Sequence, residues 1–323
     1  MKRNNLFSSV TSWATVVVVI LALVHGSLSD KVISVPAYFP NINNDLTRVT
    51  WAHAVNSRAK LNASLNDDSM MIEADILMGQ LDGSPPGTNP IPIMGHPPQT
   101  TSDLSLEEFL TTILKSGKHK GIKLDFKSKE VFASSENIVE EVLNKPEADF
   151  PVWINADVLP GPGNSPVVPV DADYFVRTVV KKFPSAMLSV GWTTFINNQI
   201  EPYTHHDIGN MTDVLSRNSV IQPVTFPVRA ALAAKSGALL TNLVRSSIPG
   251  TSLTIYNSNS SDKVDMAALR DLIHDLGKDK VYLDLSPEMM NELNQKGTGS
   301  VLSSASGLVF ASIVCLLCIN YYN

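Results

Sequence analysis

The feature that most constrains the fold is a regular alternation of short, β-branched apolar runs with longer segments of helical period. Eight runs have the pattern of strands: Arg48–Ala54, Met70–Leu77, Gly121–Phe126, Val152–Val158, Met187–Trp192, Val220–Phe226, Ser252–Tyr256 and Lys280–Leu285. Helical spacing is found between them, in segments such as Leu106–Lys115, Asn137–Asn144, Ala172–Phe183 and Met266–Leu276. Eight alternating units in about 270 residues predict an α/β fold, a closed (β/α)8 TIM-type barrel.

An open, doubly wound parallel sheet is the alternative to a closed barrel. No glycine-rich phosphate loop follows the first predicted strand, which disfavours the open sheet. A short extra strand, Ile91–Met94, interrupts the alternation after the second strand. It follows a stretch rich in glycine and proline, residues 83–87, so we expect it to fold back as a hairpin.

Residues 1–26 have the pattern of a secretory signal peptide. Lys2 and Arg3 precede an apolar run over residues 16–24, which is shorter than the roughly 20 residues that span a bilayer. Gly26 is a small residue suited to the cleavage position. We therefore predict that the leader is removed and the protein enters the secretory pathway, with an uncleaved anchor helix as the alternative.

The C-terminal residues 298–323 form a second apolar segment. The run from Gly307 to Ile319 ends close to the last residue, Asn323, and no Lys or Arg follows it. Small residues at positions 297–300 and a serine-rich spacer precede it, which is typical of a GPI-attachment signal. The alternatives are a single transmembrane helix and a tail that merely packs. We expect a barrel domain over residues 27–297 that is either held at the extracellular face of the plasma membrane or secreted.

Composition excludes some function classes. The chain has a formal net charge of −6, and an acidic domain is a poor general binder of nucleic acid. Both cysteines, Cys315 and Cys318, lie in the C-terminal segment, so the barrel domain depends on its own apolar core. Three N-x-S/T sequences predict glycosylation at Asn62, Asn210 and Asn259.

Acidic side chains occur together on two neighbouring predicted strands. Glu73 and Asp75 are two residues apart on the second strand, so they point to the same face, and Asp125 lies on the third strand. Charges inside a barrel are costly unless they are paired or bind a metal. Three carboxylates at the mouth therefore predict a site for one divalent metal ion, Mg²⁺ or Ca²⁺.

Further ionisable and polar residues end the same strands. Lys127 would offset the acidic charge or hold a phosphate, and His53 and His96 would act as an acid–base pair. Four more strand-end residues are candidates to line the site: Asn56, Asn155, Asp157 and Trp192. Each feature has a structural alternative, namely a packed histidine, an exposed acidic strand face or an interior ion pair. Their convergence on the first three strands favours a functional site.

These motifs resemble the menorin family of secreted and membrane-linked proteins. The resemblance is carried by the strings WAHAVNS, MMIEADIL, PIMGHPP, GIKLDFKS, VWINADVLPGP and SVGWTT. It is close over about residues 48–194 and continues more loosely to about residue 285. Members are implicated in dendrite branching through cell-surface adhesion complexes and in photoreceptor maintenance. The resemblance implies a recognition module whose partners are cell-surface adhesion proteins.

The same residues resemble the wider superfamily of phospholipase-C-like phosphodiesterase barrels. Its pattern is a first-strand histidine, E-x-D, a second histidine after a return strand, and an acid two residues before a lysine. In this sequence the pattern is met by His53, Glu73, Asp75, His96, Asp125 and Lys127. The resemblance implies a metal-dependent phosphodiesterase that acts on phosphodiesters or lysophospholipids, with phospholipid headgroups as partners. One departure is Ala54-Val55, where glycerophosphodiesterases have Arg-Gly.

Overall fold

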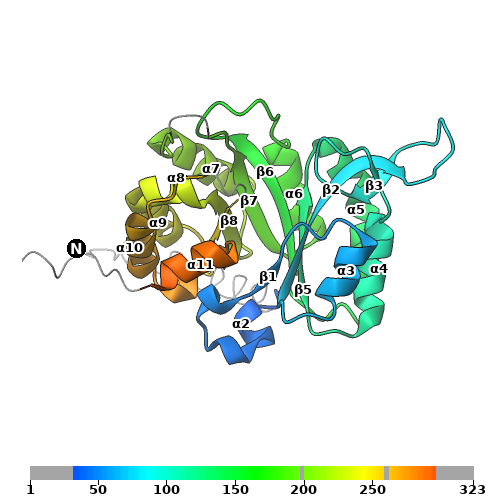
Figure 1. The fold of residues 1–323 in the computed structure, drawn as a ribbon. Helices are drawn as coiled ribbons and strands as arrows, with labels where there is room; N and C mark the ends of the chain where they lie inside the picture. Colours follow the sequence, from blue (N-terminus) through cyan, green and yellow to red (C-terminus); the bar gives the residue numbers. More distant parts are fainter. Residues whose placement is uncertain (1–31, 197–199, 258–261, 296–323) are drawn as a thin grey trace, which may run out of the picture. The chain divides into compact units, whose positions relative to one another are not determined.

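The computed structural model describes residues 32–196, 200–257 and 262–295. Its central feature is a parallel sheet whose strands follow the order β1-β2-β5-β6-β7-β8-β9-β10 (Figure 1). These strands are Trp51–Ala52, Met71–Leu81, Gly121–Phe126, Val152–Pro160, Met187–Thr193, Val224–Arg229, Ser252–Tyr256 and Val281–Asp284. The predicted leader, the C-terminal tail and Asn259 lie outside the described residues, so these remain predictions.

The sheet curls into a nearly closed barrel. Its two end strands, β1 and β10, are joined by side chains rather than by backbone hydrogen bonds. His53 Nδ1 lies 2.8 Å from Asp284 Oδ2, and the rings of Trp51 and Tyr282 are 6.4 Å apart. The predicted eight-stranded α/β barrel is confirmed.

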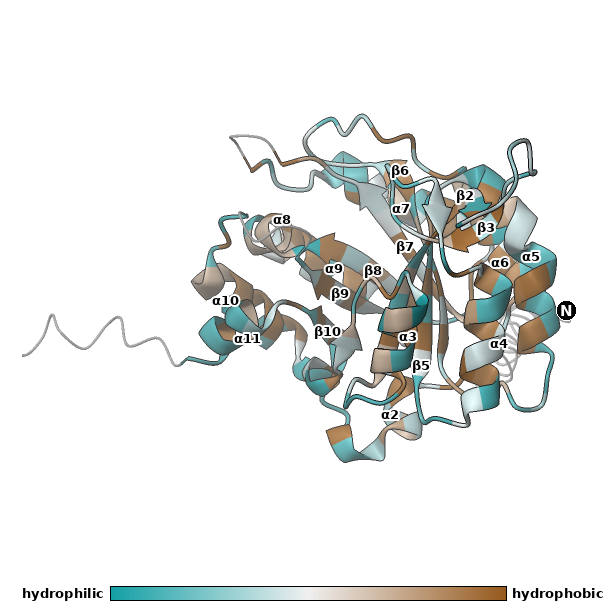
Figure 2. Ribbon diagram, turned by 45° about the vertical axis from the view of Figure 1, so that its right-hand side comes forward, coloured by the Kyte–Doolittle hydropathy of each residue, from teal (hydrophilic) through white to brown (hydrophobic). Residues whose placement is uncertain are grey.

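Amphipathic helices follow most strands and cover the barrel from outside. The larger ones are α4 Leu106–Ser116, α5 Lys129–Leu143, α6 Ala172–Lys182, α7 His205–Arg217, α9 Gly237–Ser246 and α10 Met266–Leu276; the shorter ones are α3 Arg58–Ser64 and α8 Ala230–Lys235. Figure 2 shows hydrophobic strands inside, and outer helices such as α4 that alternate between hydrophobic and hydrophilic residues. Ser105, Ser128 and Asp171 begin three of these helices, because each side chain accepts a backbone N–H of the first turn.

The N-terminal segment closes the amino-terminal end of the barrel. It contains α2 Val35–Tyr38 and two short 3-10 helices, η1 Pro40–Ile42 and η2 Leu46–Arg48; a third, η3 Lys278–Lys280, precedes β10. Apolar side chains of this segment pack against the barrel residues Met71, Trp153, Met187 and Tyr282. An aromatic floor thus lies beneath the barrel interior, with the ring centres of Trp153 and Tyr282 4.7 Å apart.

The extra strand forms the hairpin that the sequence predicts. β2 extends past the barrel and pairs antiparallel with β3, Ile91–Met94, while the short β4, Thr101–Ser102, runs parallel to its end. The hairpin projects from the barrel beside α4 and α5 in Figure 1. It matters for function because the chain that leaves β3 carries His96 back to the mouth of the barrel.

Two strand predictions are wrong at their ends. Arg48–Ala54 is predicted as the first strand, but Arg48 lies in η2 and Ala54 adopts a left-handed φ of 52°, which leaves only two strand residues. The sixth strand is predicted over Val220–Phe226 and is found at Val224–Arg229. Pro227 lies inside that strand, and proline ordinarily indicates a strand end.

The last described helix, α11 Pro287–Asn294, belongs to a second compact unit that starts at Leu285. Ser286 begins this helix, since its side chain accepts the N–H of Met289 at 3.3 Å. Throughout the described ranges, no helix combines the length and the apolar character needed to cross a membrane.

Candidate active site

A cavity of about 480 Å³ opens at the carboxyl ends of the barrel strands. Strands β2, β5, β6, β7, β8 and β9 and the loops beside them supply its walls. Eight of the predicted site residues line it: His53, Glu73, Asp75, His96, Asp125, Lys127, Asn155 and Asp157. Residues separated by up to about a third of the chain therefore meet in one space, as expected for the functional face of such a barrel.

Three carboxylates form the acidic centre of the cavity. Glu73 and Asp75 leave β2 on one face, and Asp75 lies directly beside Asp125 of β5 in the strand register. One oxygen from each of the three residues lies within 4.8 Å of the other two. Glu73 and Asp75 are buried, with 2% and 4% of their surface exposed. The period of two along β2 thus places its acids as predicted.

Lys127 and two amides hold the acids in place. The Lys127 ammonium lies 2.6 Å from Asp75 Oδ1 and 2.5 Å from Asp125 Oδ2. Asn56 Nδ2 donates to Asp75 Oδ2 at 2.8 Å, and Asn155 Nδ2 donates to Asp125 Oδ1 at 2.6 Å. Burial alone would raise the pKa of Asp125, but the charges of Lys127 and Lys123, together with the hydrogen bonds from Lys127 and Asn155, lower that pKa.

The donor set fits a hard divalent cation. The three residues offer only carboxylate oxygens, the ligands that Mg²⁺ and Ca²⁺ prefer. Each oxygen has two lone pairs, so those of Asp75 and Asp125 that accept from Lys127 and the amides retain one for a cation. Glu73, Asp75 and Asp125 are the residues that would hold the ion.

His53 follows β1 and closes the cavity on the side of β10. Its Nδ1 lies 2.8 Å from Asp284 Oδ2 and 3.5 Å from Glu73 Oε2. Burial alone would lower the pKa of His53, but the hydrogen bond to Asp284 and the charge of Glu73 raise it to about 9. The imidazole is therefore protonated at neutral pH when no metal is bound, and about half of the side chain is exposed to the cavity mouth.

The turn after His53 is shaped around Glu73. Ala54 has a left-handed φ of 52°, uncommon for a residue with a Cβ, and its N–H donates to Glu73 Oε2 at 2.8 Å. Burial raises the pKa of Glu73 to about 7, with a further contribution from the negative charge of Asp75. The strained turn thus places the Ala54 N–H where it can donate a hydrogen bond to Glu73, a carboxylate whose charged form is disfavoured by burial.

His96 reaches the same cavity from the loop after β3. Its side chain is exposed, and its Nδ1 lies 2.7 Å from the carbonyl oxygen of Pro97. Because a carbonyl oxygen only accepts, a neutral His96 carries its proton on Nδ1 and keeps a lone pair on Nε2. His53 and His96 thus belong to the same cavity but are held by different kinds of partner.

The four candidate lining residues have different positions. Asn155 and Asp157 line the cavity, and burial together with the charge of Asp125 raises the pKa of Asp157 to about 7. Asn56 stands behind Asp75 as a hydrogen-bond partner. Trp192 does not face the cavity: it is buried among apolar side chains, and its Nε1 donates to Asp207 O at 3.3 Å.

Several residues in or beside the cavity are absent from the sequence-based candidates. Asp284 holds His53 from 231 residues away, a pairing that no local pattern indicates. Arg229 ends β8 and binds Asp262 through Nε and Nη2, at 2.5 and 2.8 Å. The sequence does not identify Arg229 because the predicted strand ends at Phe226, three residues too early. Lys123 lies two residues before Asp125 on the inward face, so the period of two would have found it.

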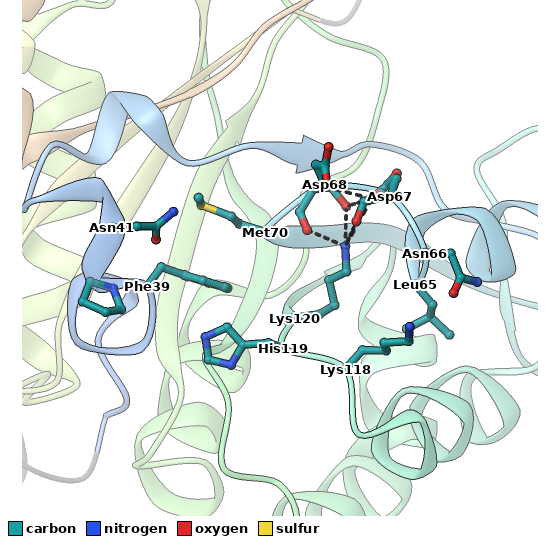
Figure 3. A pocket seen from close by; sticks show the side chains of 12 residues that line it. Phe39, Asn41, Leu65, Asn66, Asp67, Asp68, Met70, Lys118, His119 and Lys120 are labelled. Carbon is teal, nitrogen blue, oxygen red and sulfur yellow. Dashed lines mark hydrogen bonds and ion pairs between the residues drawn. The ribbon is translucent and has the colours of Figure 1, made fainter.

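A second hollow of about 480 Å³ lies at the opposite end of the strands (Figure 3). Lys120 is its most buried cation, and its ammonium donates to the backbone oxygens of Asp67 and Ser69 at 2.8 and 2.5 Å. It also contacts both of those side chains, at 3.2 and 3.3 Å. Lys120 therefore serves to fix the turn before β2.

Of the three predicted glycosylation sites, two lie in the described residues. Asn62 is exposed on α3, and Asn210 lies on α7 with its Nδ2 3.0 Å from His206 Nε2. Glycosylation at these positions remains a prediction.

Comparison with known proteins shows the family to which this chain is related. A model of the menorin N-terminal domain matches residues 45–290. Human FAM151B is 41% identical over 257 residues, which covers 78% of this chain and 87% of the human protein. A phosphodiesterase structure from Oleispira antarctica, in complex with sn-glycerol-3-phosphate, has a TM-score of 0.44 and 12% identity, and covers 75% of this chain and 94% of its own. The domain match and the identity to FAM151B show that this chain belongs to the menorin family.

Proposed function

We propose that the protein is a metal-dependent phosphodiesterase that cleaves phosphodiesters or lysophospholipids at the barrel mouth. The observation that carries the proposal is the meeting of three carboxylates, Lys127 and two histidines in one cavity. A purely structural ion pair needs neither the third carboxylate nor a histidine at the mouth. Groups of this kind, with pKa values moved by burial and neighbouring charges, are typical of catalytic sites.

The acidic cluster and Lys127 would bind the phosphoryl group. A divalent ion held by Glu73, Asp75 and Asp125 would supply positive charge to the phosphoryl oxygens. Lys127 is fixed between Asp75 and Asp125, and the charges of these acids raise its pKa well above the usual value, against the effect of burial. Its ammonium therefore stays charged throughout the neutral range and attracts the substrate anion.

His53 suits the role of general acid. With a pKa of about 9 it carries a proton at neutral pH, which it can give to the leaving oxygen. Asp284 fixes the ring through Nδ1, so the proton available to the substrate is the one on Nε2. The leaving group thus departs as an alcohol.

His96 suits the role of general base. When its Nδ1 donates to Pro97 O, the lone pair of Nε2 can accept the proton of an attacking hydroxyl group. The attacking group would be water or a neighbouring hydroxyl of the substrate, which would give a cyclic phosphate. His96 would then take a proton from the attacking oxygen, while His53 would give a proton to the leaving oxygen.

The proposal includes a location. The leader-like residues 1–26 and the apolar residues 298–323 support a place at the extracellular face of the plasma membrane, either anchored or released. There the cavity would meet extracellular Ca²⁺ or Mg²⁺ and phospholipid headgroups.

The test is turnover by the purified full-length protein on glycerophosphodiesters and lysophospholipids, with Mg²⁺, with Ca²⁺ and with EDTA. We expect metal-dependent product, and we expect His53→Ala to lower kcat by about 10²–10⁴-fold, the usual contribution of acid–base catalysis. His274→Ala is the matched control, because His274 is highly exposed on α10. Absence of turnover in the wild type, or equal rates for wild type and His53→Ala, would contradict the proposal.

A second candidate function, a non-catalytic recognition module for cell-surface adhesion proteins, is favoured by the rim of the cavity. Val167, Val168 and Phe195 are large apolar residues exposed by 58%, 82% and 47%. The two loops that carry them are joined where Phe195 N–H donates to Pro162 O at 3.0 Å. Exposed apolar groups that cluster on one surface are typical of interaction sites.

The two functions differ in which residues they need. If recognition is the function, Val168→Asp should abolish capture of an adhesion-protein ectodomain, while His53→Ala should leave capture unchanged. If catalysis is the function, His53→Ala should lose turnover whatever its effect on capture.

A further inference from the structure

Lys120 and Lys123 are two buried lysines at the start of β5 with opposite surroundings. Each has 5% of its surface exposed. The ammonium of Lys120 has four oxygen partners in the turn at Asp67–Ser69, where dashed lines mark them in Figure 3. Lys123, three residues later, makes no hydrogen bond or ion pair with any residue that the structure describes, although it lines the catalytic cavity. Lys120 is buried because its contacts stabilise the turn before β2. No such contact within the described residues explains why Lys123 is buried.

The Lys123 ammonium can reach only the cavity. In the strand register Lys123 lies beside Glu73 on one side and beside Trp153 on the other. Trp153 belongs to the aromatic floor, packing edge-on against Trp51 and Tyr282, and an indole ring offers the ammonium no hydrogen-bond acceptor. Among the described residues, the fully enclosed side-chain polar atoms that lack a partner are Trp51 Nε1 and a serine oxygen. The Lys123 nitrogen is not one of them and thus keeps contact with the cavity space.

A buried ammonium without a direct partner is costly to the folded state. The acids of the site lower this cost from a distance, because the charge of Lys123 acts on the pKa values of Glu73, Asp125 and Asp157. None of them forms an ion pair with it. Its hydrogen-bonding capacity is therefore available to a molecule that enters the cavity, and the ligand that suits three N–H donors on a cation is an anion.

We propose that Lys123 is a substrate-binding residue, whose ammonium binds a phosphoryl oxygen from the floor of the cavity. The proposal rests on the phosphodiesterase function above, which supplies the phosphate. It also accounts for the departure next to His53, where Ala54 replaces the arginine of glycerophosphodiesterases. The positive charge for the phosphate comes instead from β5, with Lys123 below and Lys127 above the metal-binding acid Asp125.

Equilibrium binding of inorganic phosphate in the presence of Mg²⁺ tests the proposal without any need for turnover. Isothermal titration calorimetry would compare the full-length wild type with Lys123→Met, Lys120→Met and Lys118→Met. The last two are matched controls, one buried with partners and one exposed. We expect Lys123→Met to weaken phosphate binding at least about tenfold, since it removes a charge-assisted hydrogen bond, and the controls to stay within about twofold.

Mg²⁺ affinity, measured on the same proteins, separates substrate binding from simple charge balance. If Lys123 only offsets the acids, Lys123→Met tightens Mg²⁺ binding and leaves phosphate affinity unchanged, which would overturn the proposal. A wild type that binds no phosphate would overturn it as well.

A measurement on the wild type keeps the proposal testable if Lys123→Met does not fold. A crystal structure with tungstate, a heavy analogue of phosphate, should show an anion oxygen within hydrogen-bond distance of Lys123 Nζ. Tungstate bound elsewhere, or none in the cavity, would refute the assignment.

The two measurements, phosphate binding and turnover, distinguish failure of the Lys123 assignment from failure of the proposed phosphodiesterase function. Phosphate binding that depends on Lys123 in a protein without turnover would support the anion site and reject hydrolysis. Turnover combined with unchanged phosphate affinity in Lys123→Met would support hydrolysis and reject the anion site.

Discussion

At the scale of single residues, the contact between His53 and Asp284 links the two ends of the sheet. The hydrogen bond of 2.8 Å ties the residue after β1 to the last residue of β10, across the one junction of the barrel that lacks backbone pairing. The same contact sets the charge of the histidine. The Asp284 carboxylate thus helps both to close the barrel and to keep His53 protonated.

Asp284→Asn should lower the pKa of His53 from about 9 toward its ordinary value, because the charge and the strong acceptor are both lost. Histidine NMR signals followed against pH in the metal-free protein measure this directly. Asp275→Asn is the control, since it removes a carboxylate beside the exposed His274. An unchanged His53 titration in Asp284→Asn would show that another group holds the proton.

The same shift makes stability depend on pH. A pKa raised in the folded state adds stability that is complete below the ordinary value of about 6.5 and is lost as pH rises through about 9. The difference in Tm between wild type and Asp284→Asn should therefore be larger at pH 6 than at pH 9.5.

The sequence predicts most of the site residues that come from the first strands and misses Asp284, which meets His53 only in the fold. The period of two places Glu73 with Asp75, and parallel pairing brings Asp125 beside them, because these are local consequences of strand geometry. Arg229 is missed because the bounds of its strand are misplaced. Asp284 comes from the last strand and meets His53 only through closure of the barrel, which no spacing in the chain indicates.

At the scale of secondary structure elements, the β2–β3 hairpin is the feature that adapts the barrel to its site. Its paired strands and β4 bring the loop with His96 over the mouth. The elements come so close at Gly79 that a Cβ there would lie 2.3 Å from Ile93 Cδ1 and 2.5 Å from the backbone oxygen of Thr100. The glycine permits the close approach of three segments.

Gly79→Ala should destabilise the protein by about 1–3 kcal/mol, the usual cost of overpacking, because the backbone of Thr100 has little room to move. It should also lower turnover, since the displaced hairpin carries His96. Urea unfolding measures the first effect and the phosphodiesterase assay the second.

Gly209→Ala is the matched control. Gly209 lies exposed in α7 with no atom within 4 Å of an added Cβ, so alanine should stabilise the helix by about 0.5–1 kcal/mol. Equal unfolding midpoints for the two variants would mean that the hairpin tolerates the added methyl group.

Element types were predictable to the extent that they follow from local periodicity. The strand Ile91–Met94 and the helix Met266–Leu276 are found at their predicted bounds. The helix predicted at Asn137–Asn144 starts eight residues earlier, at Lys129, because Ser128 supplies its N-cap. The first strand is shorter than its apolar pattern, since its ends are used to close the floor and to turn His53 toward Glu73.

At the scale of the whole barrel, its two ends have different roles. The amino-terminal end is sealed by apolar packing of the N-terminal segment against Trp153 and Tyr282, and its buried Lys120 is fully bonded. The carboxyl end keeps a polar cavity with buried acids and a cation that lacks a direct partner among the described residues. Packing at the amino-terminal end thus stabilises the fold. This allows the carboxyl end to contain buried charged groups that destabilise the fold but can bind a ligand.

A metal ion bound at the carboxyl end should therefore stabilise the whole barrel, because the carboxylates of Glu73, Asp75 and Asp125 converge only in the folded chain. At a Mg²⁺ or Ca²⁺ concentration one hundred times its Kd, the gain is about 2.7 kcal/mol. For a domain of this size that corresponds to a rise in Tm of roughly 5–10 °C. Thermal unfolding with increasing metal, and with EDTA, measures it.

Asp125→Asn should abolish this rise in Tm, because it removes the charge of one ligand while keeping its shape. Asp173→Asn is the control: Asp173 pairs with Arg217 on the outer helices, at 2.7 Å, and lies outside the cavity. If neither cation raises the Tm of the wild type, Lys127 and the amides of Asn56 and Asn155 satisfy Asp75 and Asp125, and the acidic centre is a structural ion-pair network. That result would favour the recognition function for the barrel mouth. A metal-dependent rise in Tm that is lost in Asp125→Asn would favour the catalytic function.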